Sequence, residues 1–346
     1  MAHPLVSVHI ITYNHKPYIA QAIEGALQQR TSFPFEIVIG EDCSTDGTRE
    51  IVFAYQKRYP KALRVVTSDH NVGAFANSSR VHAACSGKYI AYCDGDDWWH
   101  HSRKLQKQVD YLEAHPKVGL VHSDHDRHLT EAGTMIRDYM RVYERMSPND
   151  VTDVFSAILL GRYWIATCTV CARMDLVMQT FQQERSILED PSLLLADLPC
   201  WLNLCRRCEF FFLEESLATY RVLAESASQH RSRMDAFRFH ESSQRVRLLF
   251  AERYDCPPAV RQAVRTQYYT TLLNGAYHAG DGDLARHAFD NLRNVQNRAS
   301  LCNWLYFLGA THRPSKRLMR PFLQLRRAVL RWRKAYSIRK SKTAPR

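Results

Sequence analysis

Three carboxylates lie within four residues of one another near position 95 of this chain. Asp94, Asp96 and Asp97 belong to the stretch YIAYCDGDDWW, which spans residues 89–99. Like charges this close repel one another, and holding them in a fold costs free energy unless a positive group lies among them. Because hard divalent cations take oxygen ligands, the pattern predicts a site for Mn²⁺ or Mg²⁺.

Other polar clusters also follow stretches that read as buried strands. They are Thr12-Tyr13-Asn14, Glu41-Asp42 and Ser68-Asp69. A carboxylate at a strand end can accept hydrogen bonds from a base or a ribose, and a nearby pair can hold a metal against phosphates. The sequence contains neither GxGxxG nor GxxxxGK[ST], so we expect a metal, rather than a glycine-rich loop, to neutralise the phosphates.

The elements that must position these clusters alternate along the first 125 residues. β-branched runs such as LVSVHIITYN alternate with helical patterns such as KPYIAQAIEGALQQ. This alternation predicts an α/β fold with a doubly wound, mostly parallel sheet flanked by helices, in which ligands bind beyond the carboxyl ends of the strands. Strands and helices mix from residue 143 to 221, where YWIATCTVCAR reads as a strand and the helix in LLLADLPCWLNLCRR is expected to have its N-cap near Asp197. We divide the chain into residues 1–232, an all-helical region at 233–312, and a basic segment at 313–346.

The basic segment accounts for the positive charge of the whole chain. The formal net charge is +12, and residues 313–346 contain thirteen Lys and Arg and no Asp or Glu. Their apolar residues fall on one helical stripe, which is typical of a helix lying on an anionic membrane surface. Docking on the chain's own domain and disorder remain alternatives, and no motif for reading nucleic acid is visible.

The ten cysteines are expected to be reduced thiols of a cytoplasmic protein. No secretory signal precedes them, and no apolar run approaches the ~18 residues of a membrane span. Cys168-x-x-Cys171 and Cys205-x-x-Cys208 could together bind zinc, although small buried thiols are the favoured interpretation.

Several stretches together resemble one large enzyme family. VSVHIITYNH, EIVIGEDCSTDGTREI, NVG, GKYIAYCDGDDWW and KLQKQVDYLEAHP are similar to the inverting nucleotide-sugar glycosyltransferases of family 2, which have the Rossmann-like GT-A fold. The resemblance is close over residues 5–126 and loose over residues 163–221. It implies a nucleotide-diphosphate sugar as donor and a divalent metal as cofactor.

The resemblance also implies roles for the residues at the strand ends. Those that would contact the nucleobase are Thr12, Tyr13, Asn14 and Asp42, and Glu41 and Asn71 are further possible site residues. Asp94 would bond the ribose, and Asp96 would bind the metal that bridges the diphosphate. Asp97 would support this site or contact the sugar, while Trp98 and Trp99 would cover the sugar or belong to the core.

An inverting transfer needs a base that removes the proton of the acceptor hydroxyl. The stretch ADLPCW matches the family position of that base, which makes Asp197 the candidate. Asp197 could instead cap the helix that follows, which is a common role of aspartate. Glu189 and Asp190 are the reserve candidates.

Two positions depart from the family pattern. Ser78 and Ser79 stand where many relatives have Arg-Asn, so a donor contact is lost or is supplied by Arg80. Tyr220-Arg221 is followed by Val222 and Leu223 without the histidine of many relatives, and His230 could substitute for it.

The expected function is therefore metal-dependent, inverting transfer of a sugar, with a UDP-linked donor favoured. The acceptor would be a saccharide or a lipid-linked saccharide in cell-surface polysaccharide synthesis. The protein itself is expected in the cytoplasm or at the inner face of the plasma membrane. A nucleotidyltransferase, which would release pyrophosphate, and a nucleotide-binding scaffold without turnover are the alternatives.

Overall fold

The computed structural model describes residues 3–144, 148–223, 232–296 and 299–312. His230 and the basic segment at 313–346 lie outside the described residues, so the predictions made for them stay predictions. The chain divides into two compact units, residues 1–229 and 230–346. Our division of the chain at residue 232 also stays a prediction.

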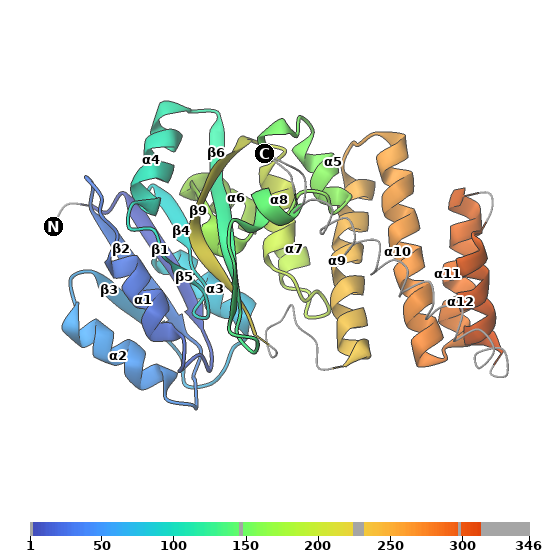
Figure 1. The fold of residues 1–346 in the computed structure, drawn as a ribbon, viewed down its shortest axis with the longest axis horizontal. Coiled ribbons are helices and arrows are strands. Elements are labelled where there is room, and N and C mark those ends of the chain that lie inside the picture. The colour runs from blue at the N-terminus through green and yellow to red at the C-terminus, as the bar shows by residue number, and fades with distance from the viewer. Residues whose placement is uncertain (1–2, 145–147, 224–231, 297–298, 313–346) are drawn as a thin grey trace. The chain divides into compact units, whose positions relative to one another are not determined.

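One mixed sheet runs through the first unit (Figure 1). Its order among the described residues is β3-β2-β1-β4-β8-β6-β9-β5, and β7 pairs with β6. The strands are β1 (Val6–Thr12), β2 (Phe35–Glu41), β3 (Leu63–Thr67), β4 (Tyr89–Tyr92), β5 (Trp98–Trp99), β6 (Val118–Leu129), β7 (Thr134–Ile136), β8 (Cys171–Arg173) and β9 (Glu209–Val222).

The sheet is parallel on one side and mixed on the other. β1 pairs in parallel with β2 and β4, and β2 pairs in parallel with β3, as the strand–helix alternation predicts. The short β8 lies antiparallel between β4 and β6, and β9 then runs parallel to β6. The expected α/β class with a mostly parallel first half is thus confirmed, and antiparallel pairing of β8 contributes to the far side of the sheet.

The predicted strand YWIATCTVCAR is wrong over most of its length. Only Cys171–Arg173 is a strand, and Thr167–Thr169 is a 3₁₀ turn. Both the backbone N–H and the hydroxyl of Thr169 donate to the Ala166 carbonyl, at 2.9 and 2.7 Å. These local bonds replace the bonds of a sheet ladder, which is a common property of threonine.

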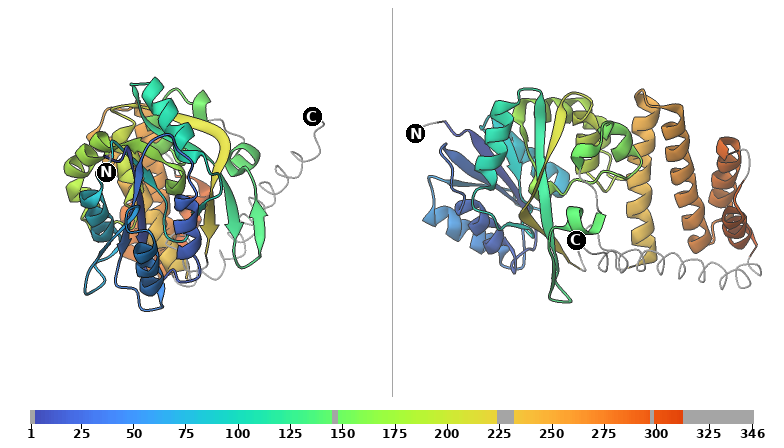
Figure 2. Two further views of the ribbon diagram at one scale, coloured as in Figure 1. Left: turned by 90° about the vertical axis from the view of Figure 1, so that its left-hand side faces the viewer. Right: turned by 45° about the horizontal axis from the view of Figure 1, so that its top comes forward.

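Helices cover both faces of the parallel strands (Figures 1 and 2). On one face Val8 of β1 belongs to the same buried cluster as Ile23 and Leu105, and on the other face His9 bonds Ser78. This alternation follows from the period of two along a strand. The α-helices of this unit are α1 (Ile19–Leu27), α2 (Thr48–Arg58), α3 (Ala74–Ala84), α4 (Lys104–Ala114), α5 (Val154–Leu159), α6 (Met174–Gln183), α7 (Arg185–Leu188) and α8 (Asp197–Leu204).

The second unit is helical where it is described. Its helices are α9 (Arg233–Arg253), α10 (Pro258–Ala279), α11 (Gly282–Gln296) and α12 (Leu301–Thr311). α10 ends at Gly280, whose φ of 73° is the left-handed conformation that glycine adopts readily at helix ends. Leu273, Phe289 and Tyr306, from three helices, share one buried cluster. In the described part of the chain, no helix has the length and apolarity needed to span a bilayer.

Candidate active site

The carboxyl ends of β1, β2 and β4 meet at one edge of the sheet. The Asp42 N–H donates to the Thr12 carbonyl at 3.1 Å, and the Gly95 N–H donates to the Ile11 carbonyl at 2.9 Å. A Cβ added to Gly95 would lie 2.7 Å from Thr12 Oγ1, so only glycine allows the Asp94–Asp97 turn to approach β1 this closely. The predicted convergence of these three strand ends is therefore present in the structure.

This edge contains polar atoms that lack a protein partner. Thr12 Oγ1 and His15 Nδ1 are both buried without a hydrogen-bond partner, and both lie against Gly95. A buried polar atom without a partner costs free energy, so each such atom in a native fold calls for an explanation. A bound polar ligand would supply the missing bonds. Tyr13, in contrast, is 44% exposed and offers its ring to the same edge.

Asn14 holds two loops together at the end of β1. Its φ is 54°, and its backbone N–H donates to Ser44 Oγ at 3.0 Å. Its side-chain oxygen accepts from the Thr45 N–H at 2.9 Å. Among non-glycine residues, asparagine is one of the few that adopt this left-handed conformation readily. Asn14 therefore shapes the site through the backbone of the neighbouring loop.

The Asp42 carboxylate receives three hydrogen bonds. The backbone N–H groups of Val72 and Gly73 both donate to it at 2.9 Å, and Arg80 Nη2 donates at 3.3 Å. The carboxylate thereby fixes the loop between β3 and α3 against the end of β2. Asn71 is exposed, and its side-chain oxygen accepts from the Gly73 N–H at 3.0 Å.

The two serines of the first family departure lie against protein groups. Ser78 Oγ contacts His9 Nε2 at 3.0 Å, and Ser79 Oγ donates to the Phe75 carbonyl at 2.9 Å. Arg80, the next residue, points its guanidinium to Asp42 and also donates to Asn77 at 2.9 Å. Arg80 therefore places a positive charge beside Asp42, and its expected contact to the donor stays a prediction.

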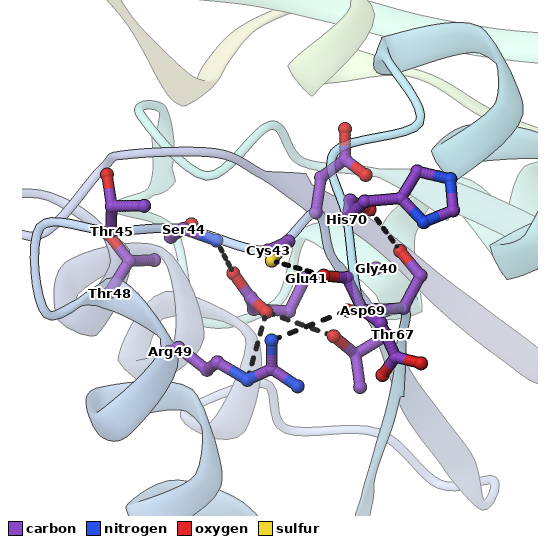
Figure 3. A network of polar contacts seen from close by, with 12 residues as sticks. Gly40, Glu41, Cys43, Ser44, Thr45, Thr48, Arg49, Thr67, Asp69 and His70 are labelled. Carbon is purple, nitrogen blue, oxygen red and sulfur yellow. Dashed lines mark hydrogen bonds and ion pairs between the residues drawn. The ribbon is translucent and has the colours of Figure 1, made fainter.

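Glu41 is fully buried at the end of β2, and Figure 3 shows its network of polar contacts. It accepts from the Ser44 N–H at 2.7 Å and from Thr67 Oγ1 at 3.1 Å, and Arg49 Nε lies 3.7 Å from it. These contacts tie β3 and the start of α2 to the end of β2. Next to it, Cys43 has a φ of 59° and its thiol donates to the Asp69 carbonyl at 3.4 Å.

The aspartates after β4 form a strongly acidic group. Burial raises the pKa of Asp94 to about 7, and the charges of Asp96 and Asp197 add to this rise. Burial, followed by the charges of Asp96 and Asp94, also raises the pKa of Asp97 well above its usual range. Asp97 is buried and accepts the Arg221 N–H at 2.7 Å, whereas Asp94 and Asp96 are half-buried.

Asp197 comes to this group from a distant part of the chain. It is the first residue of α8, and its Oδ1 accepts from the Leu198 N–H at 2.8 Å. Thr167 Oγ1 donates to its Oδ2 at 3.3 Å. The N-cap residue is Ala196, so the helix begins next to the residue where its N-cap was expected, and the Asp197 carboxylate bonds a first-turn N–H. After burial and the charge of Asp96, the charge of Asp197 contributes to the raised pKa of Asp94.

The reserve candidates for the base form contacts on their own loop. Glu189 is exposed and pairs with Arg185 at 2.8 Å. Asp190 Oδ1 accepts from the Ser192 N–H at 2.9 Å. Of the three carboxylates, Asp197 is the one whose charge contributes to the raised pKa of Asp94, and it stays the candidate for the base.

Arg221 is a site residue whose contacts the sequence did not reveal. It is buried on β9, and its Nε donates to the backbone oxygen of Asp96 at 2.6 Å. Its guanidinium also lies 4.5 Å from the Tyr18 ring and 4.4 Å from the Trp98 ring. The only available signal was its position after Tyr220 in the family pattern.

The two tryptophans have different surroundings. Trp99 is buried, and its Nε1 donates to the Cys168 carbonyl at 2.8 Å. Trp98 is half-buried between Arg221 and His128. Trp99 thus belongs to the core, and Trp98 lies beside the acidic turn.

The residues present fit a divalent cation that binds together with phosphates. In the described ranges, no group of three or more His, Cys, Asp and Glu could hold a metal ion, and this also applies to the paired cysteine motifs. Asp94 and Asp96 nevertheless supply carboxylate oxygens whose mutual repulsion a cation would relieve. Mg²⁺ is usually bound by one or two carboxylates, and substrate phosphates and water complete its shell.

Comparison with known sequences identifies the family of this part of the chain. Residues 7–162 match the model of glycosyl transferase family 2. An uncharacterized protein of Mycobacterium tuberculosis is 44% identical over 113 residues, which are 33% of each chain. The "Putative teichuronic acid biosynthesis glycosyltransferase TuaG" of Bacillus subtilis is 28% identical over 66% of this chain and 83% of its own. The match thus spans about a third of the mycobacterial relative.

Solved structures share the fold at low sequence identity. Staphylococcus aureus TarS 1–349 in complex with UDP-GlcNAc has a TM-score of 0.56 at 18% identity, over 84% of this chain and 90% of that one. The mannosyltransferase PcManGT from Pyrobaculum calidifontis, in complex with GDP-Man and Mn²⁺, has a TM-score of 0.51 at 17% identity, over 92% and 84%. Residues 7–162 of this chain therefore match glycosyl transferase family 2, and the unit to which they belong shares its fold with these solved structures.

Proposed function

We propose that this chain is a metal-dependent, inverting glycosyltransferase that uses a nucleotide-diphosphate sugar. The observation that supports the proposal is the acidic group at the sheet edge, where the charges of Asp96 and of Asp197, the first residue of α8, both act on Asp94. A carboxylate that serves as base must lie close to the carboxylates that hold the donor. The complexes of TarS with UDP-GlcNAc and of PcManGT with GDP-Man and Mn²⁺ support a donor and a metal of these classes.

The ends of β1 and β2 would bind the nucleoside. Tyr13 would stack on the base with its exposed ring, and Asp42 would accept from a ring N–H. Thr12 Oγ1 would gain the partner that it lacks within the protein. Asp94 would then accept from the ribose at the end of β4. We favour a UDP-linked donor over a GDP-linked one.

Asp96, with Asp94 beside it, would hold the metal. When bound, the metal would offset the negative charge that develops on the departing diphosphate, which is usually the largest contribution in such chemistry. Arg221 would keep the turn in place through its bond to the backbone oxygen of Asp96. Asp97 would fix the turn to β9, because its carboxylate accepts the Arg221 N–H.

Asp197 would act as the general base. Its carboxylate would accept the proton of the acceptor hydroxyl while that oxygen bonds the anomeric carbon. The bond from the anomeric carbon to the phosphate oxygen breaks on the opposite face, and the nucleoside diphosphate leaves with its electron pair. This single displacement inverts the anomeric centre. Thr167 would orient the base through its hydrogen bond to Oδ2.

Binding of UDP, GDP and CDP by calorimetry, each with and without Mn²⁺, tests the proposal. We expect one nucleotide to bind only with Mn²⁺, and Asp96→Ala to lose this binding by at least about tenfold because a metal carboxylate is removed. Asp290→Ala, at an exposed aspartate of α11, is the matched control and should bind like the wild type. Equal binding by Asp96→Ala would contradict the metal role, and absence of binding to all three nucleotides would contradict the donor site.

A further inference from the structure

Four aromatic rings surround the Arg127 side chain in the first unit. The Arg127 guanidinium carbon lies 3.5 Å from the centre of the Tyr139 ring, 4.7 Å from that of Trp164 and 5.6 Å from that of Tyr220. Arg127 Nε also donates to His125 Nε2 at 3.4 Å. We call His125, Arg127, Tyr139, Trp164 and Tyr220 the aromatic cluster. A cation over several ring faces holds those rings in fixed orientations.

One ring of the aromatic cluster reaches the surface. Trp164 is 39% exposed, whereas His125 is 1% exposed and the other members are half-buried. The rings of Trp164 and Tyr220 meet edge to face, with their centres 5.9 Å apart at 86°, and the His125 ring lies 5.2 Å from Trp164. These packed neighbours, together with the Arg127 guanidinium over the ring, fix the indole in place, so its exposed part is a rigid apolar surface next to a cation.

The aromatic cluster is joined by short stretches of chain to both halves of the candidate active site. Trp164 lies three residues before Thr167, which bonds the proposed base Asp197. Tyr220 directly precedes Arg221, which bonds the backbone of Asp96. Both stretches lead to the side of the site with Asp96 and Asp197, where the acceptor would meet the donor sugar. This position suits the acceptor.

The chemistry of the surface selects among ligand classes. An aromatic face is negative, so it attracts the slightly positive C–H groups on one face of a pyranose ring. The Arg127 guanidinium can donate to hydroxyl oxygens at the edge of such a ring, and it disfavours cationic ligands. Burial lowers the pKa of His125 to about 3, and the Arg127 charge adds to this effect, so His125 stays an uncharged ring. A sugar needs both an apolar plate and a donor at its rim, and the aromatic cluster offers both.

We propose that Trp164 is the stacking platform for a pyranose ring of the acceptor saccharide, with Arg127 at its edge. This inference rests on the proposed glycosyl transfer and adds a binding site for its second substrate. The acceptor would approach over Trp164 and present its hydroxyl to Asp197. Acceptors without a pyranose ring would lack this contact.

The test uses the full chain labelled with 5-fluorotryptophan and followed by ¹⁹F NMR. Six tryptophans give six resonances, and Trp164→Phe assigns the one of interest. The probes are cellobiose, lactose, maltose and N,N′-diacetylchitobiose. We expect at least one disaccharide to shift the Trp164 resonance and to leave that of Trp304, which is 41% exposed on α12, unchanged. If none of the four shifts Trp164, or if Trp304 shifts equally, the platform is refuted.

Two variants separate this inference from the proposed function. Trp164→Ala should weaken the binding of the disaccharide that shifts the Trp164 resonance by about tenfold. Trp164→Phe should weaken it by less, because a smaller ring retains part of the stacking surface. Nucleotide binding in the presence of Mn²⁺ should keep its affinity in both variants. Wild-type disaccharide binding by Trp164→Ala would overturn the platform while leaving the donor site intact. If the wild type binds none of the nucleotides in the presence of Mn²⁺, the proposed function is overturned instead.

Discussion

Asp94 shows how single residues give this site its chemical character. Its pKa of about 7 reflects burial first and then two neighbouring carboxylates, so the folded chain concentrates negative charge at the end of β4. Arg221 bonds the backbone of the turn and packs between Tyr18 and Trp98. Such a cluster of like charges costs folding free energy, and clusters of this kind are common at functional sites, where a ligand provides the compensating charge.

Buried histidines give a residue-level prediction about pH. Burial lowers the pKa of His122 to about 3, and its Nε2 lies 2.7 Å from the Tyr163 hydroxyl. The unfolded chain takes up this proton near pH 6.5, whereas the folded chain does not, so stability is lost as the pH falls below 6.5. His122→Gln should make the decline between pH 6.5 and 5 shallower by about 1.4 kcal/mol per pH unit.

Urea denaturation at several pH values measures this decline. Thr134, an exposed residue of β7 without a titratable side chain, provides the control, and Thr134→Gln should leave the slope of the free energy of unfolding against pH unchanged. A His122→Gln slope equal to that of the wild type would contradict a neutral, buried His122.

At the scale of elements, α1 and β5 position the acidic turn. Gly25 of α1 lies against the backbone of Trp99, and a Cβ added there would be 2.7 Å from the Trp99 carbonyl oxygen. Backbone atoms cannot rotate away as a flexible side chain can. β5 itself pairs with β9, which brings Trp98 beside Thr219 and near Arg221. The turn is therefore held by a helix on one side and by a strand on the other.

Gly25→Ala should destabilise the protein because of this contact. We expect the free energy of unfolding to fall by about 1–3 kcal/mol, although alanine favours a helix over glycine by about 1 kcal/mol. Gly282→Ala in α11 is the control, because the atoms nearest to its added Cβ are 3.8 Å away. Thermal or urea unfolding compares the two variants, and wild-type stability of Gly25→Ala would show that the contact gives way.

The sequence predicted the elements better than their long-range pairing. Local periodicity is enough to recognise β1, α1 and β2, and their polar ends pointed to the site. The insertion of β8 between β4 and β6, and the pairing of β5 with β9, join segments far apart in sequence, so no local pattern announces them. Thr167–Thr169 forms a 3₁₀ turn although its sequence looked like a strand. Threonine is frequent in strands, but its side chain can also hydrogen-bond the local backbone and stabilise a turn.

The residues of the candidate site also differ in how far the sequence alone could identify them. Asp94, Asp96 and Asp97 could be recognised from their spacing alone, because three crowded carboxylates are unusual. Asp197 required the family resemblance, since nothing in ADLPCW distinguishes a base from a helix cap. Arg221 and Trp164 were not predicted, because their importance lies in contacts that only the folded chain forms.

At the scale of the whole molecule, charge is distributed very unevenly. Residues 313–346 carry thirteen Lys and Arg without a single acidic residue, so the other residues have a formal net charge of −1 (+12 minus +13). We expect a chain ending at Thr311 to lose binding to vesicles that contain anionic lipid, since each basic residue near such a surface adds about 1 kcal/mol. Co-sedimentation at low and high salt measures this, and vesicles of neutral lipid are the control. Equal binding by the shortened chain would exclude the basic segment as the membrane contact.

The most direct test of sugar transfer with Asp197 as base is ³¹P NMR of the full chain with Mn²⁺ and a nucleotide sugar. UDP-glucose, UDP-GlcNAc and GDP-mannose are incubated with the wild type and with Asp197→Asn, with the disaccharides above as acceptors. We predict that the wild type releases a nucleoside diphosphate from one donor. Asp197→Asn should bind the same nucleotide as the wild type. It should form nucleoside diphosphate from the donor at least about 10²-fold more slowly, because the general base is lost. Release of pyrophosphate, or an unchanged rate in Asp197→Asn, would contradict this assignment.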